Sequence, residues 1–149
     1  MISTGKYRLD SAAVLIIRLA LGSLFLYVSI DKITDPSKFA LIIHNYRILP
    51  VEIINAVALI VPWIEAVLGI ALIFGIWIEA SALLLSGIIV VFIVLLMTAI
   101  IRGLNIQCGC FSVDAESEMV SWMRVIEDIG MLAGSLYIWF YSLLNRVKE

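Results

Sequence analysis

The chain has 149 residues, of which 63% are hydrophobic and 15% are charged, and its net charge at pH 7 is -2. Soluble domains have about 45–50% apolar and about 25% charged residues, so this composition, with a mean hydropathy of +1.11, indicates an integral membrane protein. The small negative charge and the lack of a basic cluster exclude nucleic acid as an expected partner.

A helix that crosses a bilayer core of about 30 Å needs about 20 apolar residues. Four segments meet this requirement, at about residues 11–33, 52–75, 78–101 and 119–144. We therefore predict an all-α integral membrane protein, a four-transmembrane-helix bundle that forms one membrane domain over residues 1–149. The first apolar segment is longer than the apolar region of a secretory signal, about 7–15 residues, and is expected to be retained.

A short helix is expected between the first two spans, at about residues 37–48. Asp35 can cap its free backbone amides, and Pro36 is well tolerated in a first turn. Apolar residues such as Phe39 and Ile42 recur at helical spacing, with polar residues elsewhere around the helix. This pattern predicts a helix that lies in the membrane interface or that packs on its own bundle.

The remaining spans differ in how clearly they are marked. The second contains Pro62 and Glu65, and Gly75 leaves almost no connection to the third, so these two spans should form a tight antiparallel hairpin. The third has no charged residue between Ala80 and Ile101. The fourth is the weakest, because its first turns carry the charged residues Arg124, Glu127 and Asp128.

The polar connection at residues 103–118 holds Cys108 and Cys110, which are the chain's two cysteines and flank Gly109. A disulfide that closes so short a loop stabilises a fold by only about 1.6 kcal/mol before strain is subtracted. Strain makes such a bond easier to reduce, which favours a dithiol that exchanges over a structural brace. Two thiols are too few for a structural zinc site, so no metal is expected there, but binding of Cu(I) and an inert pair both remain open.

Several charged residues flank this pair. Arg102 or Arg124 could favour a thiolate, or could simply anchor the helices at lipid headgroups. Asp128, or its neighbour Glu127, could relay the proton that a dithiol releases on oxidation, or could pair with a nearby cation such as Lys32 or Arg102.

Two further charges are expected inside the bundle. Arg18 should lie about 10 Å, and Glu65 about 13 Å, from the end of the bundle that holds the termini. An unpaired charge at this depth costs at least about 2.5 kcal/mol, so we predict that the two side chains pair. The pair would fix the register of the helices or form a polar wall for a quinone or substrate.

The sequence resembles a known group of membrane proteins. The resemblance rests on the run from Arg18 to Gly22, Phe25, Asp31-Lys32, the run from Pro62 to Glu65, Gly69, Gly75 and Cys108-Gly109-Cys110-Phe111. These motifs resemble the DoxX-like membrane proteins and, within them, the MauE family of methylamine utilisation. The resemblance extends from about Ser11 to Ser142, and it departs at Ser112, where a glycine would be expected.

The resemblance implies a four-helix protein of the inner membrane that helps disulfide-rich periplasmic enzymes mature beside a thioredoxin-like partner. DoxX relatives are also linked to quinone-dependent oxidation, so a quinone is a possible cofactor. Charge bias does not orient the bundle, because basic residues flank both of its ends. The redox chemistry and the resemblance together predict cytoplasmic termini and an extracytoplasmic Cys-Gly-Cys loop.

The leading hypothesis is a membrane thiol-disulfide oxidoreductase in which Cys108 and Cys110 exchange disulfides with a thioredoxin-like protein or a client enzyme. The sequence does not decide which of the two is the nucleophile. The alternatives are a soft-metal carrier that binds Cu(I) through both thiolates, and a non-catalytic membrane scaffold that recruits a partner.

Overall fold

A computed structural model of the chain describes residues 4–109 and 119–147, and all regular elements within them are α-helices. The helices are α1 Thr4–Thr34, α2 Pro36–Asn45, α3 Val51–Phe74, α4 Ile78–Ile101 and α5 Trp122–Arg146. The prediction of an all-helical protein is therefore confirmed.

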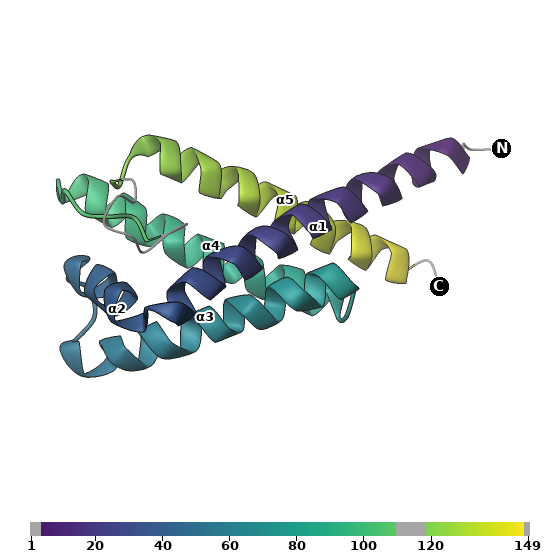
Figure 1. The fold of residues 1–149 in the computed structure, drawn as a ribbon. Coiled ribbons are helices and arrows are strands. Elements are labelled where there is room, and N and C mark those ends of the chain that lie inside the picture. The colour runs from purple at the N-terminus through teal and green to yellow at the C-terminus, as the bar shows by residue number, and fades with distance from the viewer. Residues whose placement is uncertain (1–3, 110–118, 148–149) are drawn as a thin grey trace.

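The four long helices form a ring, in which α1 and α4 each lie against both α3 and α5. The first turns of α1 and the last turns of α5 lie at one end of this ring, on the right of Figure 1. The short α2, the end of α4 and the start of α5 lie at the other end, which we call the loop end. The two ends of the cysteine connection are thus separated from the start of α1 and from the end of α5 by the length of the bundle.

Three helical segments are long and apolar enough to cross a membrane, within the described part of the chain. They are Ser11–Thr34, Val51–Phe74 and Ile78–Ile101, with mean hydropathies of 2.2, 2.4 and 3.0. The helix α5, expected as a fourth span, is not among them. Its first two turns carry Arg124, Glu127 and Asp128, which lower its apolar character.

Small residues bring neighbouring helices into backbone contact. A Cβ atom on Gly22 of α1 would lie 2.8 Å from the carbonyl oxygen of Gly69 on α3, and one on Gly69 would lie equally close to the oxygen of Gly22. On the opposite side of the ring, the Ser135 hydroxyl donates a hydrogen bond to the Ala82 carbonyl oxygen at 2.8 Å. These contacts fix the register of α1 on α3 and of α4 on α5.

The helix α2 begins where the sequence predicts. The Asp35 side chain accepts a hydrogen bond from the backbone N–H of Lys38 at 3.1 Å, which lowers the pKa of this exposed carboxyl group, and Pro36 occupies the first turn. Phe39 and Ile42 are buried and form a cluster with Ala58 of α3 and other apolar residues. Because of this packing, α2 covers the loop end of the bundle.

Candidate functional site

The cysteine connection is closed at its base by a short antiparallel contact. Gln107 and Met119 form an isolated β-bridge, and the backbone N–H of Val120 donates to the Ile106 carbonyl oxygen at 2.9 Å. Cys108 follows immediately after this contact. Its position is therefore set by the ends of α4 and α5, although the residues that follow Gly109 are not described until Met119.

Cys108 is disulfide-bonded, and no cysteine in the described residues is a free thiol. The sequence has one other cysteine, Cys110, which lies outside the described residues. Cys108 is only 5% exposed and packs in a cluster with Leu96 of α4 and Val125 of α5. Its sulfur therefore lies in apolar surroundings.

The segment after α2 holds Cys108 from the opposite side. The Tyr46 hydroxyl donates a hydrogen bond to the Cys108 carbonyl oxygen at 2.8 Å, and the Arg102 guanidinium donates to the Tyr46 carbonyl oxygen, also at 2.8 Å. Gly109 has a φ of 67°, and a Cβ atom there would lie 2.7 Å from the Ile42 side chain. Glycine is thus required between the two cysteines both by the backbone conformation and by the space that α2 leaves.

Tyr46 is buried, and its surroundings change its acidity. Burial is the main cause that raises the pKa of its phenol, and the negative charge of Asp128 raises this pKa further. The hydroxyl therefore keeps its proton and its hydrogen bond to Cys108 across the physiological pH range.

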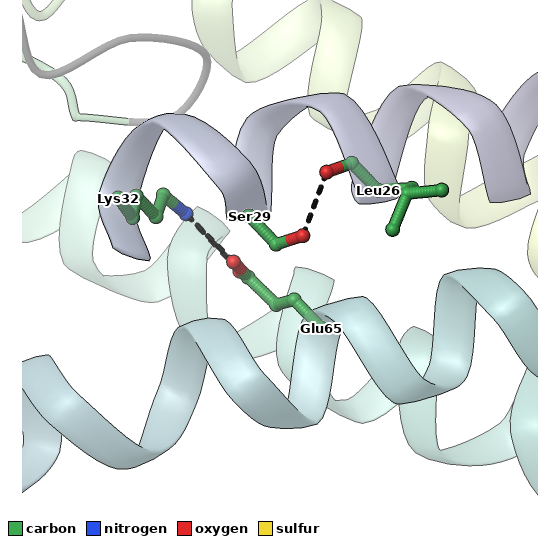
Figure 2. Close-up of polar contacts among 4 residues, drawn as sticks. All are labelled: Leu26, Ser29, Lys32 and Glu65. Atoms are coloured by element: carbon green, nitrogen blue, oxygen red, sulfur yellow. Dashed lines mark hydrogen bonds and ion pairs between the residues drawn. The ribbon is translucent and has the colours of Figure 1, made fainter. Parts of the chain in front are cut away.

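A buried ion pair joins α1 and α3 near the loop end, as Figure 2 shows. The Lys32 ammonium donates hydrogen bonds to both carboxylate oxygens of Glu65, at 3.1 and 3.0 Å. Both side chains are only 1% exposed. The ammonium also lies 4.9 Å from the ring centre of Phe39 and 4.8 Å from that of Phe92, so two aromatic rings add to its stabilisation.

A second carboxylate enters this region from α5. Asp128 is only 3% exposed, and its Oδ2 atom has no hydrogen-bond partner among the described residues. It interacts electrostatically with Lys32 and with Tyr46. Asp128 also follows Val125 by three residues and therefore lies one helical turn deeper on the same face.

The predicted pairing of Arg18 with Glu65 is wrong, because Glu65 pairs with Lys32. Arg18 lies four residues before Gly22, and Glu65 lies four residues before Gly69. Since α1 and α3 are antiparallel and these glycines touch, the two offsets run in opposite directions and separate the charges by about 12 Å along the bundle. The Arg18 guanidinium lies instead against Gly75, at the C-terminal end of α3.

The other predicted site residues lie around the same end. Arg124 forms an ion pair with Glu127 at 2.6 Å, and Arg102 contacts the Tyr46 carbonyl group as described above. Neither contact is with a sulfur atom, so an effect of these cations on a thiolate stays a prediction. No group of three or more His, Cys, Asp or Glu side chains that could hold a metal ion occurs within residues 4–109 and 119–147.

A groove of about 660 Å³ lies between α1 and α5, and its lining can be compared with the expected quinone. Its walls are apolar side chains and two glycines, and Arg124 and Glu127 lie along it. The walls suit the isoprenoid tail of a quinone, whereas both polar side chains already pair with each other. The groove therefore fits the tail of a quinone better than its head.

Sequence reasoning missed Lys32 and Tyr46 as members of the site. The sequence offers Lys32 as a cation that could pair with the carboxylates of the fourth span and as part of the Asp31-Lys32 motif, and it marks Tyr46 only by helical spacing from Phe39 and Ile42. The signal that could have identified Tyr46 is its hydroxyl group, because a phenol buried on an apolar helix face needs a hydrogen-bond partner.

The fold and the site define a helical membrane protein that holds a disulfide-bonded cysteine at one end of its bundle, above buried charges. The family model described as methylamine utilisation protein MauE matches residues 10–141. The chain therefore belongs to the MauE family, which confirms the resemblance at that level. Membership of the wider DoxX-like group stays a prediction.

Curated relatives carry the same description. The methylamine utilization protein MauE of Paracoccus denitrificans is 28% identical over 123 residues, which are 82% of this chain and 66% of that protein. The proteins of the same name from Methylorubrum extorquens and Paracoccus versutus are each 27% identical, over 69% and 80% of this chain and 55% and 64% of their own lengths. The chain thus spans less than two thirds of the length of these relatives. No solved structure matches it significantly.

Proposed function

We propose that the protein is a membrane thiol-disulfide oxidoreductase that exchanges its disulfide with a dithiol protein. The observation that carries the proposal is that Cys108 is disulfide-bonded at the end of a membrane bundle. A bond across so short a loop stabilises the fold little, so a structural role would not explain its position. The printed name of the relatives suggests that this exchange serves methylamine utilisation.

The exchange proceeds in two balanced steps. A thiolate of the partner attacks the disulfide, forms a mixed disulfide with one of Cys108 and Cys110, and releases the other as a thiolate that takes up a proton. The second thiol of the partner then loses its proton, attacks the mixed disulfide and leaves with the disulfide, while the remaining cysteine becomes a thiol. Two electrons pass from the partner to the protein, and the reverse sequence oxidises the partner.

The proposed topology places four helices across the inner membrane, with α5 as the fourth span and α2 in the interface. The burial of Asp128 supports this assignment, because this charged residue of α5 faces the other helices and not lipid. In this arrangement the termini are cytoplasmic and the cysteine loop is extracytoplasmic, where disulfides persist. The partner would be a thioredoxin-like periplasmic protein or a disulfide-rich client enzyme.

The proposal includes a quinone only as a possible acceptor of the electrons in the groove between α1 and α5. When bound there, a quinone would accept two electrons and two protons from the reduced cysteine pair. The apolar walls around Leu21 and Met131 would hold its tail. The exchange with a dithiol partner does not depend on it.

The test is the oxidation of a reduced thioredoxin by the purified protein in lipid nanodiscs, measured by alkylation of free thiols and mass spectrometry. We expect about one thioredoxin dithiol oxidised per protein molecule, and none with the Cys108→Ser/Cys110→Ser double variant. A double variant that oxidises thioredoxin as well as the original protein would overturn the proposal. Failure of the original protein to react would favour a non-catalytic scaffold.

A further inference from the structure

The loop end of the bundle holds three buried charged residues, Lys32, Glu65 and Asp128, and only two of them contact each other. Lys32 directs its ammonium group at both carboxylate oxygens of Glu65, so this pair is already matched. Asp128 is a second buried carboxylate with an oxygen that lacks a hydrogen-bond partner among the described residues. An ionised carboxylate in this state is costly, whereas a protonated one is much less so.

The position of Asp128 connects it with the disulfide. Val125, one helical turn nearer to the loop end on the same face of α5, packs in the cluster that contains Cys108. Tyr46 binds the Cys108 carbonyl group and lies within the electrostatic range of Asp128. Asp128 is therefore a buried acid one helical turn from a residue that packs in the Cys108 cluster, with no second described carboxylate on that face of α5.

We infer that Asp128 carries the proton that Cys108 gains and loses during disulfide exchange. This inference rests on the proposed function. It goes beyond that function by naming the group that serves the buried sulfur. The surroundings of Cys108 explain why such a group is needed, because a thiolate between Leu96 and Val125 would be poorly solvated.

During disulfide exchange, the proton moves between Asp128 and the Cys108 sulfur. When a dithiol partner attacks the sulfur bonded to Cys108, the S–S bond breaks and Cys108 leaves with the bonding electron pair. The protonated Asp128 gives its proton to this sulfur, directly or through a water molecule, and becomes a carboxylate near the Lys32 ammonium. The first partner thiol releases a proton to solvent before its attack, and the second releases one when it resolves the mixed disulfide; one of these protons restores Asp128 and the other protonates the Cys110 thiolate that leaves. In the opposite direction Asp128 accepts the proton of the Cys108 thiol.

The helices that pack against α5 are α1 and α4. The titratable groups that interact electrostatically with Asp128 are Lys32 of α1, Tyr46 after α2, and Arg124 and Glu127 of α5 itself. Tyr46 keeps its proton, because burial raises the pKa of its phenol. Both oxygens of Glu65 accept hydrogen bonds from Lys32, whereas one oxygen of Asp128 has no partner among the described residues, so Asp128 is the group best placed to exchange a proton.

The experiment measures the rate at which dithiothreitol reduces the disulfide of the purified protein, corrected for the thiolate fraction of dithiothreitol at each pH. The corrected rate of the original protein should fall as pH rises and Asp128 loses its proton. Asp128→Asn should lower the rate roughly 100-fold and remove this pH dependence, and Asp128→Glu should restore part of both. Glu79→Gln, a matched carboxylate-to-amide change at the far end of the bundle, should leave both unchanged.

A second measurement does not depend on the folding of the asparagine variant. Infrared spectroscopy of the oxidised protein at mildly acidic pH should show a protonated carboxyl band that shifts in Asp128→Glu. An unchanged rate and pH profile in Asp128→Asn, or a band that does not shift in Asp128→Glu, would overturn the inference while leaving the proposed function intact. If the original protein does not exchange with dithiothreitol at all, the proposed function itself fails.

Discussion

Lys32 is the residue that allows two buried carboxylates to share the loop end of the bundle. Its ammonium contacts Glu65 and two aromatic rings, and it acts at longer range on Asp128. Ion pairs of this kind give up much hydration, so their net stabilisation is small, but the loss of one partner leaves the other charge unmatched.

Removal of Lys32 alone should therefore lower the free energy of unfolding far more than removal of both Lys32 and Glu65. Lys32→Met leaves Glu65 buried and unpaired, and we expect it to lower the free energy of unfolding by about 3–5 kcal/mol. The double variant Lys32→Met/Glu65→Leu should recover most of this loss, because neither charge remains. The measurement is the unfolding of the purified proteins in one detergent.

Lys38 provides the control for this comparison. Its ion pair with Asp35 at 3.2 Å is exposed, with side-chain exposures of 50% and 38%. Lys38→Met should change the free energy of unfolding by only about 0–1 kcal/mol. Equal losses in the two lysine variants, or no recovery in the double variant, would show that the buried pair does not have the role assigned to it.

At the scale of the helices, the contact of α1 with α3 decides which charges can meet. Gly22 and Gly69 let the two backbones touch, and this contact places Lys32 beside Glu65 and Arg18 beside Gly75. A shift of one helical turn, about 5.4 Å, would separate the ammonium from the carboxylate. The glycine contact and the ion pair therefore support the same register.

Substitution of these glycines should test this register. Gly22→Ala and Gly69→Ala each place a Cβ atom 2.8 Å from a backbone oxygen, so each should lower the free energy of unfolding by about 1–3 kcal/mol. Gly87→Ala is the matched control, because a Cβ atom there meets nothing within 4 Å. It should be neutral or stabilising by up to about 1 kcal/mol. A similar loss in all three variants would argue against a specific contact of α1 with α3.

The sequence was sufficient to predict the helices themselves. Long apolar runs, the Asp35-Pro36 start and the turn at Gly75 depend on local chemistry, which each segment carries by itself. The partner of Glu65 could not be predicted in the same way, because depth was counted from the helix ends. The true register depends on which small residues touch, and Gly22 and Gly69 are only two of several glycines in the spans.

At the scale of the whole molecule, the bundle places a disulfide-bonded cysteine and buried charges at the same end. A Cys-Gly-Cys sequence in a short polar connection is distinctive, so the sequence alone proposes Cys108 as a site residue, and this role stays a prediction. Its burial against α4 and α5 was not predictable, nor was the hydrogen bond from Tyr46, since both arise where distant segments meet. Cys110 lies outside the described residues, so its role in the site stays a prediction.

The central claim is that the cysteine pair is an oxidised, exchangeable disulfide on the extracytoplasmic face of the membrane. The most direct test is labelling of the cysteines in intact cells and in inverted membrane vesicles with a membrane-impermeant maleimide, before and after an impermeant reductant. We predict no labelling before reduction, and labelling afterwards only when both reagents reach the extracytoplasmic face. Labelling without reduction, or labelling from the cytoplasmic face alone, would contradict the claim.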